Sequence, residues 1–452
     1  MRFDSTTSKT RARIAFTTLG CRVNQYDTQA LKEQAEKASL QTVPFEEPAD
    51  IYVINTCTVT AAADAEGRML VRRAKGKNPG SFVVVTGCLA QDRPQEMAEL
   101  AGVDLVVGNA EKSRLLNKIV QTYFRDEAVT DFPLSILHSP LSPWVGGISR
   151  FDGHQRATIK VQDGCNFGCS FCLVPRVRGK MISRPELEIV EEGKRLAQTG
   201  VRELVLAGIQ LSSYGRDLGL RAPEPRLAPV VEKLLAIPGI RRVRLSSYGV
   251  ADFEEALLPL WQSRTGLCTH IHLPLQSGDA GVLKAMRRPY SLDRYRRTVE
   301  KVRKANARIG LTTDILVGFP GETDKAFENT FGRIREFGFI DFHPFPYSER
   351  PHTPGEKMIP KTAPAILRER MNRIWEFKKE RLALSAHEFL GRECRVIVER
   401  HDQERQAGLT DEGFRVLFPK KEGWLGKEAH VKVIGVEAGA ALAEWLETVN
   451  AS

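Results

Sequence analysis

Short apolar segments alternate with amphipathic helical segments along most of the chain, and this alternation limits the possible folds more than any other feature. Strands separated by helices form parallel sheets, because a parallel neighbour needs a crossover connection long enough to hold a helix. Near the N-terminus, strands are predicted at residues 14–17, 51–54, 82–86 and 105–107, and helices at 27–38 and 61–74. We therefore expect a parallel α/β domain over residues 12–127.

The same alternation returns in the middle of the chain. Strands are predicted at residues 157–161, 203–207, 242–245, 270–273, 310–317 and 341–346, with helical segments between them. A closed barrel of eight such units usually takes about 250 residues, and this segment is shorter. The sequence therefore predicts a parallel (β/α) barrel that is incomplete.

The remaining segments complete the domain plan. Prolines and glycines interrupt any regular pattern in residues 128–150, which we expect to be a linker. A charged helix at 362–388 precedes short β segments at 394–399, 413–418 and 428–435. The expected α/β organisation is thus an N-terminal domain (12–127), a linker (128–150), a barrel core (151–388) and a small all-β barrel (389–452).

Positive charge is concentrated in two runs. The chain carries 66 Lys and Arg residues against 56 Asp and Glu, for a net charge of +10. Ten of the basic residues lie between Lys284 and Arg308, and five lie between Arg68 and Lys77. Such runs can neutralise phosphates, although a solvated surface explains the net charge equally well. No stretch is long and apolar enough to span a membrane and no secretory signal is recognisable, so we expect a cytoplasmic protein with no membrane partner.

Three of the eight cysteines follow the ends of predicted strands, and we call them the N-terminal trio: Cys21, Cys57 and Cys88. Parallel sheets gather ligands beyond the carboxyl ends of their strands, so these thiols should meet at one edge of the sheet. Metal or redox chemistry is the expected use of cysteine in a chain without a secretory signal. The alternative is three small core residues, because unpaired cysteine is often buried.

A second group of cysteines, the loop trio, lies within eight residues: Cys165, Cys169 and Cys172. Three thiolates on one loop can bind three irons of a [4Fe–4S] cluster and leave the fourth iron open to a small ligand. A structural zinc site is the alternative, but zinc prefers four protein ligands and no fourth Cys or His follows nearby.

The cysteines belong to a series of motifs that resembles those of the radical S-adenosylmethionine (SAM) methylthiotransferases. In chain order the motifs are Thr18-Leu-Gly-Cys21-Arg-Val-Asn, Asn55-Thr-Cys57, Thr86-Gly-Cys88, the loop trio, His272-Leu-Pro-Leu-Gln276-Ser-Gly, Met286-Arg-Arg288 and Thr313-Asp-Ile-Leu-Val-Gly. The C-terminal segment resembles the RNA-binding TRAM domain, with Gly408-Leu-Thr410 at its expected turn. The resemblance covers about residues 12–450.

This resemblance implies two [4Fe–4S] clusters, SAM and a catalytic role for all six motif cysteines. The cluster of the loop trio would reduce SAM to a 5′-deoxyadenosyl radical, which abstracts hydrogen from the substrate. The cluster of the N-terminal trio would hold a sulfur atom that a second SAM methylates. Further SAM contacts are expected at Phe171, Gly208, Gln210, Ser246, His272 and Gln276, although a glycine after a strand is also typical of an ordinary turn.

The substrate expected from the resemblance is tRNA. The Leu-Gly-Cys21-Arg-Val-Asn motif is most similar to the branch that converts threonylcarbamoyladenosine (t6A) at position 37, in the anticodon loop, to its 2-methylthio derivative. The alternatives are isopentenyladenosine at position 37 or an aspartate of a ribosomal protein. An external reductant and a sulfur source would be needed. A non-catalytic iron–sulfur electron carrier or an RNA-binding module is the alternative from outside this enzyme class.

Overall fold

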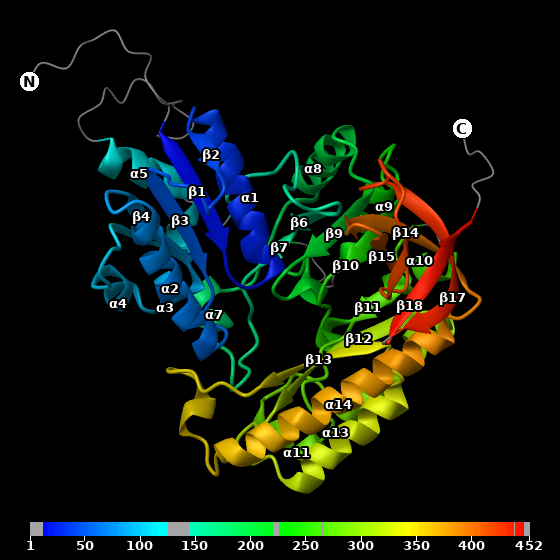
Figure 1. The fold of residues 1–452 in the computed structure, drawn as a ribbon. Coiled ribbons are helices and arrows are strands. Elements are labelled where there is room, and N and C mark those ends of the chain that lie inside the picture. Colours follow the sequence, from blue (N-terminus) through cyan, green and yellow to red (C-terminus); the bar gives the residue numbers. More distant parts are fainter. Residues whose placement is uncertain (1–11, 125–143, 220–225, 264–265, 438, 447–452) are drawn as a thin grey trace, which may run out of the picture. The chain divides into compact units, whose positions relative to one another are not determined.

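The computed structural model of the 452-residue chain describes residues 12–124, 144–219, 226–263, 266–437 and 439–446. These residues form two compact units (Figure 1). The first unit comprises the described residues up to Ile148 together with Arg176–Gly179, and the second comprises Ser149–Pro175 and the described residues from Lys180 onward. Most of the expected linker lies outside the described residues, and the four-part division of the chain stays a prediction.

The first unit is built on a five-stranded parallel sheet with the order β2-β1-β3-β4-β5. Its strands are β1 (Arg13–Thr18), β2 (Gln41–Val43), β3 (Ile51–Thr56), β4 (Phe82–Gly87) and β5 (Leu105–Gly108). The prediction of four of these strands is confirmed. The edge strand β2 was missed because it has only three residues and none of them is buried.

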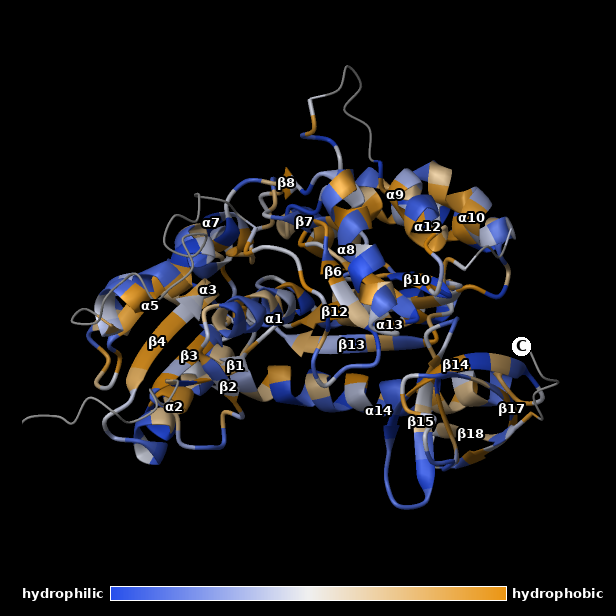
Figure 2. Cartoon of the chain, turned by 90° about the horizontal axis from the view of Figure 1, so that it is seen from above, coloured by the Kyte–Doolittle hydropathy of each residue, from blue (hydrophilic) through white to orange (hydrophobic). Residues whose placement is uncertain are grey.

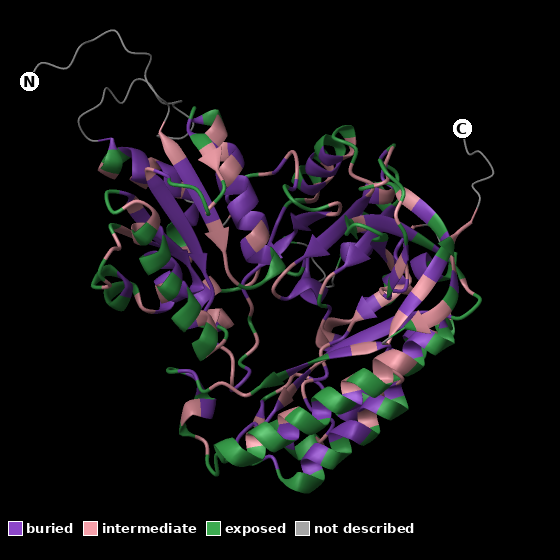
Figure 3. Ribbon diagram, in the orientation of Figure 1, coloured by how far each residue is buried: buried purple, intermediate pink, exposed green. Residues whose placement is uncertain are grey.

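Helices cover both faces of this sheet, whose central strands are buried along their length (Figure 3). They are α1 (Arg22–Lys37), α2 (Ala61–Lys77), α3 (Cys88–Asp92), α4 (Pro94–Ala98), the 3-10 helix η1 (Asn109–Arg114) and α5 (Leu115–Tyr123). One core cluster joins Tyr52, Val83 and Val85 of the sheet to Leu70 and Val71 of α2. Helix α1 begins directly after Cys21, earlier than the predicted start at residue 27.

The second unit contains the six predicted barrel strands: β6 (Ala157–Lys160), β9 (Glu203–Ala207), β10 (Arg242–Leu245), β11 (His270–His272), β12 (Gly310–Val317) and β13 (Asp341–Pro346). They form two parallel sheets of three strands, which the isolated bridges Val243–Leu267 and Ser247–His272 connect. Among the described residues β6 does not pair with β13, so the prediction of an incomplete parallel barrel is confirmed.

Helices cover the outside of this barrel, and hydrophilic and hydrophobic residues alternate along them (Figure 2). They are α8 (Glu186–Gln198), α9 (Leu227–Leu235), α10 (Leu258–Ser263), α11 (Ala280–Ala285), α12 (Leu292–Ala305), α13 (Asp324–Phe337) and the long α14 (Pro364–Glu388). Helix α12 is typical, because it buries Leu292, Tyr295, Val299 and Val302 at helical spacing. No helix in the described parts of the chain has the length and apolar character needed to cross a membrane.

Short elements surround the cysteine loop and the connections between the barrel strands. They are β7 (Gln162–Asp163), α7 (Val174–Arg178), β8 (Ile182–Ser183) and the 3-10 helices η3 (Leu211–Ser213), η4 (Val250–Asp252), η5 (Glu255–Leu257) and η6 (Pro354–Lys357).

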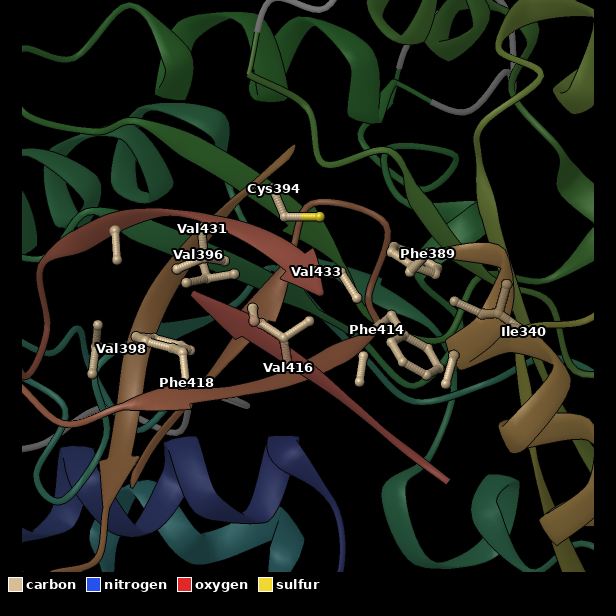
Figure 4. Close-up of a cluster of buried hydrophobic side chains, with 14 residues drawn as sticks. Ile340, Phe389, Cys394, Val396, Val398, Phe414, Val416, Phe418, Val431 and Val433 are labelled. Atoms are coloured by element: carbon tan, nitrogen blue, oxygen red, sulfur yellow. The ribbon is translucent and has the colours of Figure 1, made fainter. Parts of the chain in front are cut away.

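A closed five-stranded barrel ends the second unit, with the order β14-β15-β16-β18-β17. Its strands are β14 (Glu393–His401), β15 (Arg405–Thr410), β16 (Arg415–Pro419), β17 (Glu428–Glu437) and β18 (Ala440–Trp445). Valine and phenylalanine side chains fill its core (Figure 4). The predicted turn at Gly408–Thr410 is wrong, because these residues pair with β14 inside β15. Strand β18 was missed because its alanine-rich sequence lacks the β-branched residues typical of strands.

A buried ionic network holds this terminal barrel against the start of the parallel strands. Glu203 accepts hydrogen bonds from Arg242 at 2.5 Å and from Arg244 at 2.7 Å. Arg242 also reaches Asp411 at 2.7 Å, in the turn between β15 and β16. Burial by itself raises the pKa of Glu203, but the guanidiniums of Arg242, Arg244 and Arg156 outweigh burial and hold that pKa well below its ordinary value. The network lies at the amino-terminal ends of β9 and β10, whereas the cysteine loop follows the carboxyl end of β6.

Candidate functional site

The N-terminal trio lies at the carboxyl ends of three adjacent strands. Cys57 follows β3 directly, Cys88 follows β4 directly, and Cys21 comes three residues after β1. These strands are neighbours in the sheet and run in parallel register, so their ends are about 4.8 Å apart from one strand to the next. The structure therefore brings all three cysteines to one edge of the sheet, where the strand–helix alternation predicts them.

Two glycines make this arrangement possible. Gly20 has a φ of +91°, and a Cβ atom on it would lie 2.8 Å from the Cβ and Sγ atoms of Cys57. Gly87 has a φ of +97°, and its Cβ would lie 2.4 Å from the carbonyl oxygen of Thr56. Both the backbone conformation and the close approach exclude a larger residue at either position. The glycines before Cys21 and Cys88 thus allow the three strand ends to converge.

The thiols of the N-terminal trio influence one another. Burial raises the pKa of Cys57 to about 11, and the neighbouring Cys88 and Cys21 add to the shift. Two neutral donors approach the sulfurs here: the amide of Val59 at 3.5 Å from Cys57 Sγ and the side-chain amide of Asn109 at 3.5 Å from Cys88 Sγ. A buried thiol of this kind gives up its proton when a metal centre binds. The donor set therefore suits an iron–sulfur cluster.

Residues 176–179 belong to the first unit although they follow the loop trio in sequence. Arg176 pairs with Asp92 at 2.8 Å, and Arg178 donates a hydrogen bond to Asn24. The carbonyl oxygen of Val177 accepts a hydrogen bond of 2.8 Å from Asn109, the residue that also approaches Cys88. Polar contacts thus attach this segment to the edge of the sheet that carries the N-terminal trio.

The loop trio follows β6 and the short β7, at the predicted end of the first barrel strand. The amide of Phe167 approaches Cys165 Sγ at 3.4 Å, and the amide of Cys172 donates a hydrogen bond to the carbonyl oxygen of Cys169 at 3.1 Å. Burial raises the pKa of Cys172 to about 12, and Cys169 and Cys165 add to that shift. Burial likewise raises the pKa of Cys165. The backbone of this loop therefore folds back at Cys169 and keeps the three cysteines on one short turn, as the ligands of one cluster require.

Two glutamines attach this loop to the barrel. The side chain of Gln162 accepts a hydrogen bond of 2.7 Å from the backbone amide of Gln210 and donates to the carbonyl oxygen of Gly164 at 2.8 Å. The side-chain oxygen of Gln210 accepts a hydrogen bond of 3.1 Å from the amide of Asn166. Gly208 has no room for a side chain, because a Cβ on it would lie 2.9 Å from the Gln162 side-chain oxygen. Two of the predicted SAM contacts, Gly208 and Gln210, therefore lie directly beside the cysteine loop.

The loop is also attached on its other side. The amide of Ser170 donates a hydrogen bond of 3.0 Å to the carbonyl oxygen of Met286, and its hydroxyl donates one of 2.8 Å to that of Ala285. Arg288 places a guanidinium nitrogen 3.2 Å from Cys169 Sγ. Gln162 and Arg288 are functional candidates for which the sequence alone predicts no role. The motif around Met286 pointed to Arg288, whereas no signal pointed to Gln162.

The other predicted SAM contacts are distributed along the barrel strands. Phe171 packs edge-on against Phe319 at 6.4 Å between ring centroids, and Ser246 follows β10. The ring of His272 bonds to Asp314 at 3.2 Å and to Thr312 at 3.0 Å.

Gln276 has a φ of +67°, a left-handed conformation that is uncommon for a residue other than glycine and typical of functional segments. Its backbone bonds to both Asp314 and Leu316 of β12. The roles of all six predicted SAM contacts stay predictions.

Most basic side chains of the two runs form ion pairs or hydrogen bonds within the protein. In the first run, Arg68, Arg73, Lys75 and Lys77 pair with carboxylates. In the second run the same is true of Arg296, Lys301 and Arg308, while Arg294 and Arg303 bond to carbonyl oxygens. Within the described residues, the basic side chains of these runs that join no ion pair and donate no side-chain hydrogen bond are Arg72, Lys284, Arg287, Arg297 and Lys304. Fewer charges are therefore available for phosphates than the sequence suggests.

The described residues contain no group of three or more Cys, His, Asp or Glu side chains placed to hold a single metal ion. A [4Fe–4S] cluster binds each thiolate through a different iron, so its thiolates need not converge on one point. The remaining cysteines, Cys268 and Cys394, are both buried, and Cys394 lies in the core of the terminal barrel (Figure 4).

Comparison with known proteins agrees with this geometry. Residues 159–334 match the radical SAM superfamily, and residues 13–108 match a family described as uncharacterized protein family UPF0004. A solved radical S-adenosylmethionine methyltransferase, TsrM from Kitasatospora setae with cobalamin and a [4Fe-4S] cluster bound, shares the fold with a TM-score of 0.55 and 15% identity. The match covers 76% of this chain and 77% of that one.

Curated relatives match over nearly the whole chain. The threonylcarbamoyladenosine tRNA methylthiotransferase MtaB of Bacillus subtilis is 33% identical over 94% of both chains, and that of Aquifex aeolicus is 36% identical over 89% of this chain and 97% of its own. A tRNA-2-methylthio-N(6)-dimethylallyladenosine synthase of Methylacidiphilum infernorum is 32% identical over 92% of this chain and 91% of its own. The chain therefore belongs to the radical SAM methylthiotransferase family, as the cysteine motifs predict.

Proposed function

We propose that this enzyme inserts a methylthio group at C2 of threonylcarbamoyladenosine at position 37 of tRNA. The observation that carries the proposal is the combination of both cysteine trios in a chain that is similar, over nine-tenths of its length, to a relative named for this reaction. The N-terminal trio and the loop trio would each hold one [4Fe–4S] cluster. When bound, the clusters and SAM supply the radical that removes hydrogen and the methylthio group that replaces it.

The residues of the chain perform the positioning. The strand ends of the first unit present Cys21, Cys57 and Cys88 without the help of a continuous loop. In the second unit, Gln162 and Gln210 hold the cysteine loop beside the barrel mouth. The carboxyl ends of parallel barrel strands are the usual place for substrate, and His272 and Gln276 lie at the end of β11 and just beyond it.

The tRNA partner would be read at its anticodon loop, whose unstacked bases are accessible to a protein. The basic residues Lys284, Arg297 and Lys304, which join no ion pair within the described residues, support contact with phosphates. Cofactor loading and turnover require an external reductant and a sulfur source. We place the reaction in the cytoplasm, where tRNA is available.

A second candidate substrate is dimethylallyladenosine (isopentenyladenosine) at position 37. The similarity to relatives named for its methylthiolation, at 32% and 33% identity, favours it as the alternative. The t6A substrate is preferred because the relatives named for it reach 38% identity.

The test is a reconstitution without oxygen. The protein, loaded with iron and sulfide, is incubated with SAM, a reductant and tRNA that carries either t6A or dimethylallyladenosine, and the digested nucleosides are analysed by mass spectrometry. We expect a methylthio product from the t6A tRNA alone, and none from Cys21→Ala or Cys169→Ala. Product from the dimethylallyladenosine tRNA alone would replace the substrate, and cleavage of SAM without any tRNA product would refute tRNA modification.

A further inference from the structure

Arg288 makes the one contact between a charged side chain and a thiol of the loop trio that the described residues show. Its Nη1 atom lies 3.2 Å from Cys169 Sγ. A guanidinium is always protonated in proteins, so this donor carries a permanent positive charge. Cys169 is itself buried, which reduces the screening of that charge by water.

Tyr290 holds the guanidinium of Arg288 in place on the side away from Cys169. Arg288 Nε donates a hydrogen bond of 3.2 Å to the hydroxyl of Tyr290, and the guanidinium lies 4.9 Å from the centre of the Tyr290 ring. That hydroxyl donates in turn to the carbonyl oxygens of Pro274 and Leu275, at 2.8 and 2.9 Å. Tyr290 is buried. The direction of the Arg288 side chain is therefore fixed by the barrel and does not depend on the cysteine loop alone.

The same segment holds the loop itself. Ser170, next to Cys169, bonds to the carbonyl oxygens of Ala285 and Met286, which lie three and two residues before Arg288. The segment from the end of α11 to Arg288 thus holds the backbone beside Cys169 and places a cation next to its sulfur. At the N-terminal trio, by comparison, the neutral side-chain amide of Asn109 approaches the sulfur of Cys88.

We propose that Arg288 sets the reduction potential of the cluster held by the loop trio, by stabilising its reduced form through Cys169. This inference rests on the proposed function, which assigns that cluster to these three cysteines. Transfer of one electron from an external low-potential reductant adds one negative charge to the cluster and oxidises the reductant by one electron. A fixed cation beside a cluster thiolate favours the form with more negative charge, because hydrogen bonds and charge near the sulfurs set cluster potentials. Arg288 acts through Cys169 and is therefore a positioning residue.

The test is a redox titration of the full-length chain in which Cys21, Cys57 and Cys88 are replaced by alanine, so that one cluster remains. Dithionite supplies the electrons, and electron paramagnetic resonance reports the reduced cluster. Arg288→Gln removes the positive charge. Arg288→Lys keeps the charge but lacks the planar guanidinium and its fixed N–H donors. Arg287→Gln, at the exposed neighbouring position, is the matched control.

We expect Arg288→Gln to reduce the equilibrium constant for reduction at least tenfold, which is about 59 mV for one electron. Arg288→Lys should lie between Arg288→Gln and the unmodified protein, and Arg287→Gln should not differ from the unmodified protein. A loaded Arg288→Gln cluster with unchanged potential would overturn the proposal. So would an unchanged potential with weakened SAM binding, which would assign the guanidinium to SAM. Absence of a cluster from the parent chain, measured as iron content, would instead refute the proposed function.

Should Arg288→Gln fail to load, Tyr290→Phe gives an independent measurement, because it removes the hydrogen-bond acceptor of Arg288 Nε and leaves the charge. A smaller fall in potential is expected there, and no change or a rise would contradict the proposal.

Discussion

The loop trio and the N-terminal trio present three thiols each, but the chain builds them in different ways. The loop trio lies on one short segment of the second unit, and local hydrogen bonds such as that from Cys172 to Cys169 shape it. The N-terminal trio extends over residues 21–88 and exists only where β1, β3 and β4 have paired. One site is therefore a property of a loop, whereas the other is a property of a folded sheet.

This difference also determines what each site tolerates. A local loop closes at low entropic cost, while contacts between distant segments depend on the whole sheet. The two sites differ again in charge, because Arg288 approaches the loop trio and Asn109 approaches the N-terminal trio. The comparison teaches that two similar donor sets can differ both in robustness and in electronic environment.

The largest expected effect separates the chemical roles of the two trios. Cys169→Ala should abolish both the cleavage of SAM to 5′-deoxyadenosine and the methylthio product. Cys88→Ala should abolish the product but retain SAM cleavage, because the loop trio is intact. Chromatography of 5′-deoxyadenosine and mass spectrometry of nucleosides measure the two outcomes.

Cys394→Ala, in the core of the terminal barrel, is the control and should retain both activities. The comparison fails if Cys88→Ala also loses SAM cleavage while its loop-trio cluster is loaded.

The next effect tests the dependence of the N-terminal trio on its sheet. Gly20→Ala would place a methyl group 2.8 Å from Cys57 Sγ in a left-handed backbone conformation. We expect the variant to lose about half of the bound iron, which is one of two [4Fe–4S] clusters, and to keep SAM cleavage. Iron analysis after reconstitution measures the loss.

Gly76→Ala is the matched control for this variant. Gly76 lies in α2 of the same unit, and a Cβ atom on it would meet nothing within 4 Å. Full iron content in Gly20→Ala would show that the sheet edge adapts more readily than its geometry indicates.

The loop trio should keep its cluster when stability is lost elsewhere in the second unit. Glu203→Gln leaves Arg242 and Arg244 without their buried carboxylate, and breaking such a pair costs about 3–5 kcal/mol of unfolding free energy. Urea denaturation at pH 7 measures this cost. Iron bound by the loop trio should remain under native conditions, because the network lies at the opposite ends of the strands.

The pH dependence of this variant has a defined sign. The pKa of Glu203 is lower in the folded chain than the unfolded value of about 4.3. Its contribution is therefore complete above that unfolded pKa and is lost as the pH falls further toward the folded pKa. Glu203→Gln should lose less stability on acidification than the unmodified protein. Glu191→Gln, which breaks an exposed pair with Lys194, should cost at most about 1 kcal/mol and serves as control.

The smallest effect concerns the neutral donor of the N-terminal trio. Asn109→Leu removes a hydrogen bond to Cys88 Sγ but no charge. In a chain with the loop trio replaced by alanine, we expect a negative shift of the cluster potential that is smaller than the shift caused by Arg288→Gln. An equal or larger shift would show that charge is not the important difference between the two sites.

Much of this architecture can be predicted from the sequence. The six barrel strands and the main strands of the N-terminal sheet are apolar segments bounded by helices, so their pattern is strong. Edge strand β2 and the alanine-rich β18 were missed because neither carries the buried β-branched residues that mark a strand. The turn expected at Gly408 was wrong because a glycine can also sit inside a strand where another backbone approaches closely, as that of Ile397 does here.

The residues of the candidate site likewise fall into those that the sequence predicts and those that only the folded chain reveals. Cysteine spacing predicted the loop trio directly, and strand ends predicted the convergence of Cys21, Cys57 and Cys88. Gln162 could not be found, because its role depends on a hydrogen bond to Gln210 that only the folded barrel creates. The contact between Arg288 and Cys169 joins residues 119 positions apart, and no local pattern encodes it.

The turn between β15 and β16 decides how relatives of this enzyme can be recombined. A Cβ atom on Gly310, at the start of β12, would lie 1.9 Å from the carbonyl oxygen of Glu412, and Asp411 neutralises Arg242 from the same turn. A chimera that takes its terminal barrel from another protein therefore loses these contacts. They are kept when the turn at Asp411 and Glu412 is exchanged together with Arg242, Arg244 and Gly310. The natural unit of exchange is this matched set, and a cut placed at the end of α14 divides it.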